Sequence, residues 1–205
     1  MVVVAVVVPY ETRRHRQEVC EALARKFFPA ERYEIRWVGW KEKEGGEGYV
    51  CVVDFVRKSY EPEFDCAEYC EMAAEYYAER FLAGERGEGE EAYEACVNTC
   101  EFSLEKAVVS SVEFDPETLK VRTSTIAGTC YWVAPSADGE EFFEEKEKMI
   151  SSVEGAGCEY ADETWIHPHE LVDLGLELEE EPAVCYYHLR GCPLPTLLRV
   201  AGEWF

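Results

Sequence analysis

The sequence predicts an α+β fold, with a mixed or antiparallel sheet, packed helices and a disulfide-stapled helical hairpin over residues 63–101. Three observations support this. Short runs rich in β-branched and aromatic residues, typical of strands, recur between Gly- and Pro-containing turns. Segments with apolar residues at helical spacing lie between these runs. Two Cys-x-x-x-Cys pairs fall inside residues 63–101 and connect two of the expected helices.

The composition is that of a folded protein. The 205 residues are 47% hydrophobic and 13% aromatic, which is enough apolar material for a sizeable core. We therefore expect a single α+β domain over residues 1–205. The alternative is a subdivision into 1–114 and 115–205.

The N-terminal elements are expected in the order strand, helix, strand, strand. Val2–Val8 is a continuous β-branched run, as in a buried strand. Apolar residues repeat at helical spacing over 11–28, and Pro29 ends that segment. Arg32–Trp40 alternates, and Tyr49–Val56 follows a Gly-rich loop, so both are predicted strands. This order resembles a split βαββαβ sheet in which the cysteine hairpin replaces the second helix.

The C-terminal half begins with a predicted β-hairpin. Leu104–Phe114 and Leu119–Thr125 flank residues 115–118, where Asp and Pro favour a turn. We then expect a strand at Thr129–Ala134, an acidic helix at Glu140–Val153, a short helix at 168–176, a strand at 183–189 and a C-terminal helix at 194–201.

The four cysteines of the hairpin are placed symmetrically. Cys66 and Cys70 are four residues apart, as are Cys96 and Cys100, and residues four apart share one face of a helix. A Gly-rich turn at 84–89 lies between the pairs, so two antiparallel helices would bring the four sulfurs together. The helices are expected at 63–83 and 90–101, and the disulfides are Cys66–Cys100 and Cys70–Cys96. The alternative is four thiolates that bind zinc or an iron–sulfur cluster.

The paired motif resembles the twin Cys-x-x-x-Cys motif of the small mitochondrial intermembrane-space chaperones, which are disulfide-bonded helical hairpins. The resemblance covers residues 66–100, and the 25 residues between Cys70 and Cys96 exceed the usual gap of that family. It implies the stapled geometry for this chain and nothing about its activity.

Six further cysteines lie outside the hairpin: Cys20, Cys51, Cys130, Cys158, Cys185 and Cys192. Cys185 and Cys192 flank a short segment and are expected to close it as a loop. Cys20 and Cys51 fall on elements that should pack together, so they either pair or act as small buried apolar residues. The remaining two have no predicted partner, because spacing alone does not determine connectivity.

A basic cluster occurs where the first expected helix begins. Cations near a helix N-terminus oppose the helix dipole, and a bound anion held by free N–H groups and arginines would compensate for this. We therefore predict a small-anion or phosphate site there. The alternative is that the arginines pair with surface glutamates. The candidate residues are Tyr10, Thr12, Arg13, Arg14 and Arg16, next to His15.

The sequence also offers a candidate metal site. His167 and His169 are two residues apart, so in an extended segment both would project to one side and, with Glu170, supply ligands for zinc or another transition metal. His188 is a further candidate nearby. The alternative is that these residues only start a helix. Pro168 is then its first residue, His167 caps it, and Glu170 lies in its first turn.

Composition predicts the source and the compartment. The acids comprise 37 Glu and six Asp, with one Gln and one Asn, and this pattern is typical of hyperthermophiles. Ten cysteines normally indicate an oxidising compartment, yet Val2–Val8 lacks the basic region of a signal peptide and no stretch is long enough to cross a bilayer. Hyperthermophiles keep disulfides inside the cell, so we expect a cytoplasmic protein of such an organism.

Charge and motifs limit the function classes. A net charge of −23 disfavours nonspecific binding to duplex nucleic acid and is suited to a basic protein partner. A P-loop, a dinucleotide-binding glycine fingerprint and a Ser/His/Asp order are all missing from the sequence. We expect a non-enzymatic binding or structural protein braced by disulfides. The alternative is an anion- or phosphate-ligand-binding domain, or a metal-dependent enzyme, that uses Arg13–Arg16 or His167 and His169.

Overall fold

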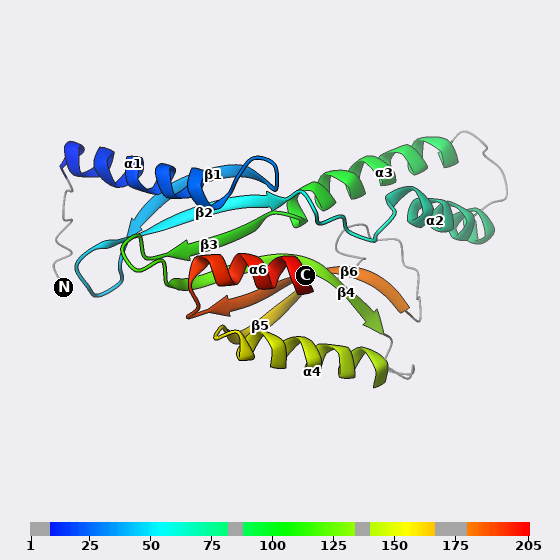
Figure 1. Cartoon of the computed structure of the whole chain (residues 1–205). Coiled ribbons are helices and arrows are strands. Elements are labelled where there is room, and N and C mark those ends of the chain that lie inside the picture. The colour runs from blue at the N-terminus through cyan, green and yellow to red at the C-terminus, as the bar shows by residue number, and fades with distance from the viewer. Residues whose placement is uncertain (1–8, 82–87, 134–139, 167–179) are drawn as a thin grey trace, which may run out of the picture.

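The computed structural model describes residues 9–81, 88–133, 140–166 and 180–205. These residues form a six-stranded sheet in the order β1-β2-β3-β4-β6-β5, in which all neighbouring strands are antiparallel (Figure 1). β1 to β4 form a meander, since each pairs with the next strand along the chain. The strands are β1 (Tyr33–Glu42), β2 (Tyr49–Arg57), β3 (Ser110–Phe114), β4 (Val121–Val133), β5 (Glu159–Ile166) and β6 (Glu180–Arg190).

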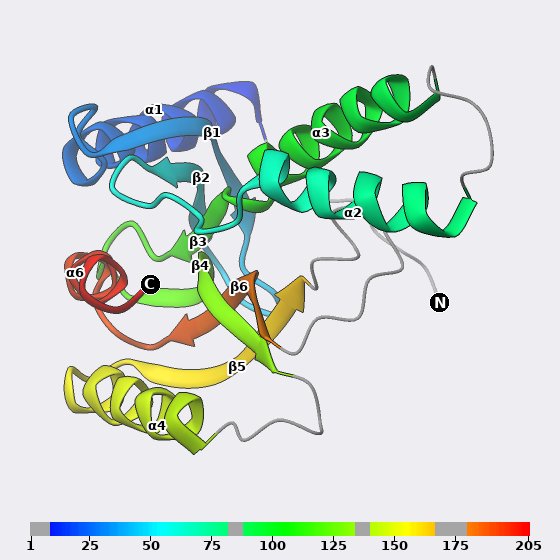
Figure 2. The same cartoon turned by 90° about the vertical axis from the view of Figure 1, so that its right-hand side faces the viewer.

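The helices lie on both sides of this sheet. α1, α4 and α6 cover one face, whereas the hairpin of α2 and α3 projects on the other side (Figure 2). Each helix that the structure describes is too short or too polar to span a bilayer. The helices are α1 (Tyr10–Phe27), α2 (Cys66–Phe81), α3 (Glu88–Ala107), α4 (Glu140–Gly155) and α6 (Leu194–Trp204).

The main core lies between the sheet and the three covering helices. Alternation along β2 directs Cys51, Val53 and Phe55 to this face, where all three are fully buried. Phe28, just after α1, packs on Phe55 with ring centroids 4.8 Å apart. Burial of such aromatic and aliphatic surface is the dominant favourable term in folding.

One cation is also directed into this core. Arg57, the last residue of β2, is 3% exposed and donates hydrogen bonds of 2.7 Å to the main-chain oxygens of Ala201 and Phe205. It also donates to the main-chain oxygen of Ala127 on β4. The guanidinium therefore connects β2, β4 and the end of α6.

The predicted α+β class and stapled hairpin are confirmed, and the sheet is antiparallel. The split βαββαβ arrangement is wrong, because it would insert the 2–8 strand between β2 and β3, which instead pair directly. The predicted strand at Val2–Val8 and the predicted helix at 168–176 lie outside the described residues.

β4 is one long strand where the sequence predicted two, at Leu119–Thr125 and Thr129–Ala134. Gly128 falls in the gap between the two predicted strands, where it makes room for neighbouring side chains. A Cβ there would lie 2.8 Å from the Tyr187 ring and 3.0 Å from Phe205. The glycine therefore marks close packing inside the strand, not its end.

Two other boundaries differ from the prediction. α3 continues to Ala107, so the strand predicted from Leu104 begins only at Ser110. β5 was not predicted at all. Among the described strands it lies at the edge of the sheet and pairs with β6 alone, and its polar residues are compatible with solvent on its other side.

All ten cysteines form disulfides. The predicted pairs Cys66–Cys100 and Cys70–Cys96 are confirmed, which leaves none of the four sulfurs as a thiolate for a metal. Cys20 pairs with Cys51, one of the two alternatives.

The predicted Cys185–Cys192 loop is wrong. The two residues instead form Cys130–Cys185 and Cys158–Cys192, with Cα atoms 5.9 and 4.5 Å apart. Sheet register explains the first pair, because Cys185 lies opposite Gly128 on the neighbouring strand, two residues from Cys130 and on the same face.

Candidate functional site

Two arginines of the predicted anion site, Arg14 and Arg16, have different surroundings on α1. Arg14 is exposed and pairs with Glu18 at 2.9 Å. The Arg16 guanidinium lies over the rings of Trp40 and Tyr49, 4.9 Å from each centroid. The structure therefore does not bring these two arginines together. The remaining candidates, Tyr10, Thr12 and Arg13, occupy the first turns of α1, and the anion site there stays a prediction.

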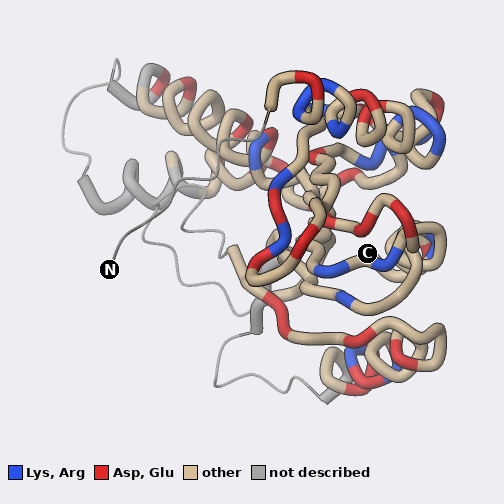
Figure 3. The backbone as a smooth tube through the Cα atoms, turned by 90° about the vertical axis from the view of Figure 1, so that its left-hand side faces the viewer, with Lys and Arg blue, Asp and Glu red and all other residues tan. Residues whose placement is uncertain are grey.

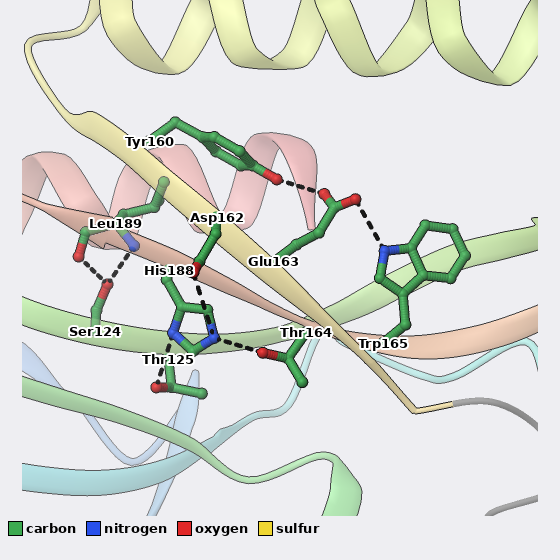
Figure 4. Close-up of polar contacts among 9 residues, drawn as sticks. All are labelled: Ser124, Thr125, Tyr160, Asp162, Glu163, Thr164, Trp165, His188 and Leu189. Atoms are coloured by element: carbon green, nitrogen blue, oxygen red, sulfur yellow. Dashed lines mark hydrogen bonds and ion pairs between the residues drawn. The ribbon is translucent and has the colours of Figure 1, made fainter.

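The predicted metal ligands His167, His169 and Glu170 lie outside the described residues. His188 is described, and its ring lies between two threonine hydroxyls on the sheet face opposite α4 (Figure 4). Nδ1 is 3.4 Å from Oγ1 of Thr125, and Nε2 is 3.0 Å from Oγ1 of Thr164. The described part of the chain contains no group of three or more His, Cys, Asp or Glu side chains that could hold a metal ion.

A cleft of about 660 Å³ opens between α4 and the sheet, and we call it the α4 cleft. Such a volume is typical of small-molecule sites. Strands β4, β5 and β6 form its base, and α4 and the end of α6 form its sides. Its aromatic lining consists of Tyr131, Phe142, Phe143, Trp165, Tyr187 and Trp204.

The aromatic walls are partly open to solvent. Phe143, Trp204 and Tyr131 are 68, 41 and 37% exposed, so large apolar side chains gather where nothing in the described chain covers them. Tyr131 stacks on Phe142 with ring centroids 5.4 Å apart. Tyr187 is held in the base, stacked on Phe205 at 4.2 Å. These contacts fix the rings before any ligand binds.

Glu163 organises the polar part of the α4 cleft. Its side chain is 11% exposed, and it forms an ion pair with Lys146 of α4. Oε1 also accepts the indole N–H of Trp165 at 2.9 Å, and Oε2 accepts the hydroxyl of Tyr160 (Figure 4). A carboxylate has about four acceptor sites, so the three donors leave one on Oε2.

The environment fixes the protonation states of these groups. Burial favours the neutral form of Glu163, but hydrogen bonds from Lys146, Tyr160 and Trp165 outweigh it and lower the pKa below the ordinary value. Burial, and then the hydrogen bond to Glu163, raises the pKa of Tyr160. Burial likewise raises the pKa of Tyr187. At neutral pH the carboxylate is therefore ionised and both phenols are neutral.

A second carboxylate contact links the α4 cleft to the segment that precedes the hairpin. The hydroxyl of Tyr131 donates to Glu63, and this bond is the main reason why the pKa of Tyr131 rises to about 12. Tyr131 is therefore neutral at physiological pH, and its ring is held at the edge of the cleft.

Sequence reasoning missed the α4 cleft. Its residues come from β4, α4, β5, β6 and α6, and no local motif joins them. The sequence did contain one signal. Glu163 lies two residues from Trp165 in a segment that alternates as a strand does, so a charged residue shares the inward side with a tryptophan.

The chain matches no protein-family model, and no curated protein or solved structure matches it either. Function therefore has to be argued from the site itself.

Proposed function

We propose that the protein is a non-catalytic, disulfide-braced ligand-binding protein and that the α4 cleft is its binding site. The observation that supports this most is the aromatic lining, of which Phe143, Trp204 and Tyr131 remain substantially exposed. Concave sites with aromatic walls and a few oriented polar groups are the usual form of small-molecule sites.

The charges of the cleft favour a neutral ligand. Two acids, Glu145 and Glu163, are matched by two bases, Lys146 and Lys148. A charged ligand would therefore gain little attraction and would lose its hydration. The ligand class that fits is a planar, largely apolar molecule with one hydrogen-bond donor, which would meet the unoccupied acceptor site on Oε2 of Glu163.

The state of the titratable groups supports binding over catalysis. The carboxylate of Glu163 is already ionised and accepts three hydrogen bonds, and Tyr160 stays protonated. A general base needs a pKa near the working pH, and a group stabilised as the anion is a poor proton acceptor.

The α4 cleft can be tested with 1-naphthol, a neutral planar aromatic with one hydroxyl donor. Calorimetric titration should give saturable binding that Trp204→Ala weakens about tenfold, because a large aromatic contact is lost. Trp37→Ala is the matched control, since Trp37 is also an exposed tryptophan but lies on β1, outside the cleft lining. Equal affinities of both variants, or no binding by the wild type, would contradict the proposal.

We also propose that the protein works in the cytoplasm of a hyperthermophile. The support is the excess of Glu with a single Gln and a single Asn, together with five disulfides. Calorimetry of the oxidised protein should give a melting temperature above about 90 °C. A value of about 45–65 °C, as in mesophilic domains, would contradict this origin.

A further inference from the structure

A second concave region lies away from the α4 cleft, between the C-terminal end of α1 and α6, and we call it the α1–α6 groove. Its volume is about 820 Å³. The turn before β1 and the end of β2 form its floor. Its apolar lining includes Phe27, Pro29, Tyr33 and Leu198.

The charge of the α1–α6 groove is opposite to that of the protein. Its lining contains one acid, Glu31. The same lining contains five cations: Lys26, Arg32, Arg57, Lys58 and Arg199. The whole chain carries a net charge of −23, and Figure 3 shows its acids spread over helices and strands. Such a local excess of positive charge attracts anions that the rest of the surface repels.

Three of these cations lack a carboxylate partner. Within the described chain, Lys26, Arg32 and Lys58 take part in none of the ion pairs. Lys26 lies in the last turn of α1, where the helix dipole favours a cation. The dipole does not account for Arg32 or Lys58, which lie outside the helix, and Lys58 Nζ only donates to the main-chain oxygen of Ala30 at 2.5 Å.

Arg57 provides an independent indication. It is almost completely buried, and its two terminal nitrogens donate to the main-chain oxygens of Ala127, Ala201 and Phe205. Its Nε is buried and has no hydrogen-bond acceptor. An unsatisfied buried donor is costly. An anion in the α1–α6 groove that accepted from this Nε–H would lower that cost.

We propose that the α1–α6 groove binds a small organic phosphate monoester. Its phosphate would be held by Arg32, Arg57 and Lys58, since guanidinium groups match the geometry of phosphate oxygens. Its apolar part would lie against Phe27 and Leu198. This site differs from the one that the sequence predicted at residues 10–16, and it does not depend on the α4 cleft.

Phenyl phosphate is the test probe, because it combines a dianionic phosphate with an apolar ring. Titration followed by ¹⁵N–¹H spectra should shift the Nε–H signal of Arg57. The double substitution Arg32→Gln/Lys58→Gln should weaken binding at least about tenfold, since two charge-assisted contacts are lost. Both side chains are exposed, so the fold should be unaffected.

The matched control is Arg14→Gln/Lys106→Gln, which removes the same charge from exposed positions elsewhere. Its affinity for phenyl phosphate should stay within about twofold of the wild type. Equal weakening in both double variants would reduce the effect to diffuse attraction and overturn the proposal. So would an unshifted Arg57 signal, or no saturation at millimolar phenyl phosphate. Benzoate should bind more weakly than phenyl phosphate, and the reverse order would rule out a phosphate site.

Discussion

The carboxylate of Glu163 and the indole of Trp165, two residues apart on β5, are joined by a hydrogen bond of 2.9 Å from Nε1 to Oε1. The polar group of the α4 cleft therefore fixes the orientation of one of its aromatic walls. The same carboxylate accepts hydrogen bonds from Lys146 on α4 and from Tyr160. One side chain thus connects α4, β5 and an aromatic wall of the α4 cleft.

Glu163→Gln should reduce the free energy of unfolding by about 1–3 kcal/mol, because a largely buried ion pair loses its anion while Lys146 stays in place. Chemical denaturation measures the difference. Glu147→Gln is the matched control, since Glu147 is an exposed acid on α4 outside the cleft lining, and it should change stability by less than about 0.5 kcal/mol. Equal losses in the two variants would show that Glu163 is an ordinary surface acid.

The effect of Glu163 should depend on pH in a defined direction. Its folded-state pKa lies below the ordinary value of 4.5, so its contribution is complete above pH 4.5 and is lost as the pH falls through the folded pKa. The stability difference between wild type and Glu163→Gln should therefore be constant near neutrality and shrink in acid. Urea unfolding at a series of pH values would show this, and a difference that grows in acid would be inconsistent with it.

Arg57→Met should destabilise the fold by about 2–4 kcal/mol, because it removes a buried donor from three main-chain oxygens. Since two of these oxygens belong to Ala201 and Phe205, amide exchange should become faster in α6 than in α1. The exposed neighbour variant Lys58→Met controls for the loss of charge. A loss of stability no larger than that of Lys58→Met would mean that Arg57 does not hold α6 on the sheet.

Two disulfides allow stability to be separated from ligand binding. Cys130–Cys185 closes a loop with a sequence separation of 55, and Cys66–Cys100 one of 34. Each should contribute roughly 4 kcal/mol in the chain-entropy model, so alanine at both positions of either pair should lower the melting temperature by roughly 8–16 °C.

Only the first pair adjoins the α4 cleft, because Cys130 lines it. Cys130→Ala/Cys185→Ala should therefore weaken 1-naphthol binding, whereas Cys66→Ala/Cys100→Ala should leave it unchanged. Calorimetric titration well below both melting temperatures makes the comparison. If the hairpin variant loses as much affinity, the separation of hairpin and cleft is wrong.

The stapled hairpin could be predicted because its information is local. Cysteines four residues apart share a helix face, and a Gly-rich segment between two such pairs reverses the chain. Cys185 shows where this reasoning fails. Its partner Cys130 lies on the adjacent strand, and that adjacency follows from sheet order, which spacing does not encode. Cys192, which is nearer to Cys185 in the sequence, pairs with Cys158 instead.

The two candidate sites could not be predicted for a related reason. Phe143 and Trp204 belong to different helices, and both line the α4 cleft only because these helices pack on one side of the sheet. The Arg13–Arg16 run looked like a site because its charges are consecutive. On a helix, however, residues two apart point in different directions, so Arg14 and Arg16 have separate partners.

The central claim is that the α4 cleft binds a planar, neutral molecule, and the indole N–H signals of the five tryptophans test it most directly. Spectra of ¹⁵N-labelled protein are recorded during titration with 1-naphthol, with naphthalene and 1-naphthoate as probes that lack the donor or carry a charge. The account predicts that 1-naphthol shifts the signals of Trp165 and Trp204 with one saturation curve, leaves those of Trp37 and Trp40 in place, and binds more tightly than the other two probes. Unshifted Trp165 and Trp204 signals at saturating probe, or equal shifts of Trp37, would contradict it.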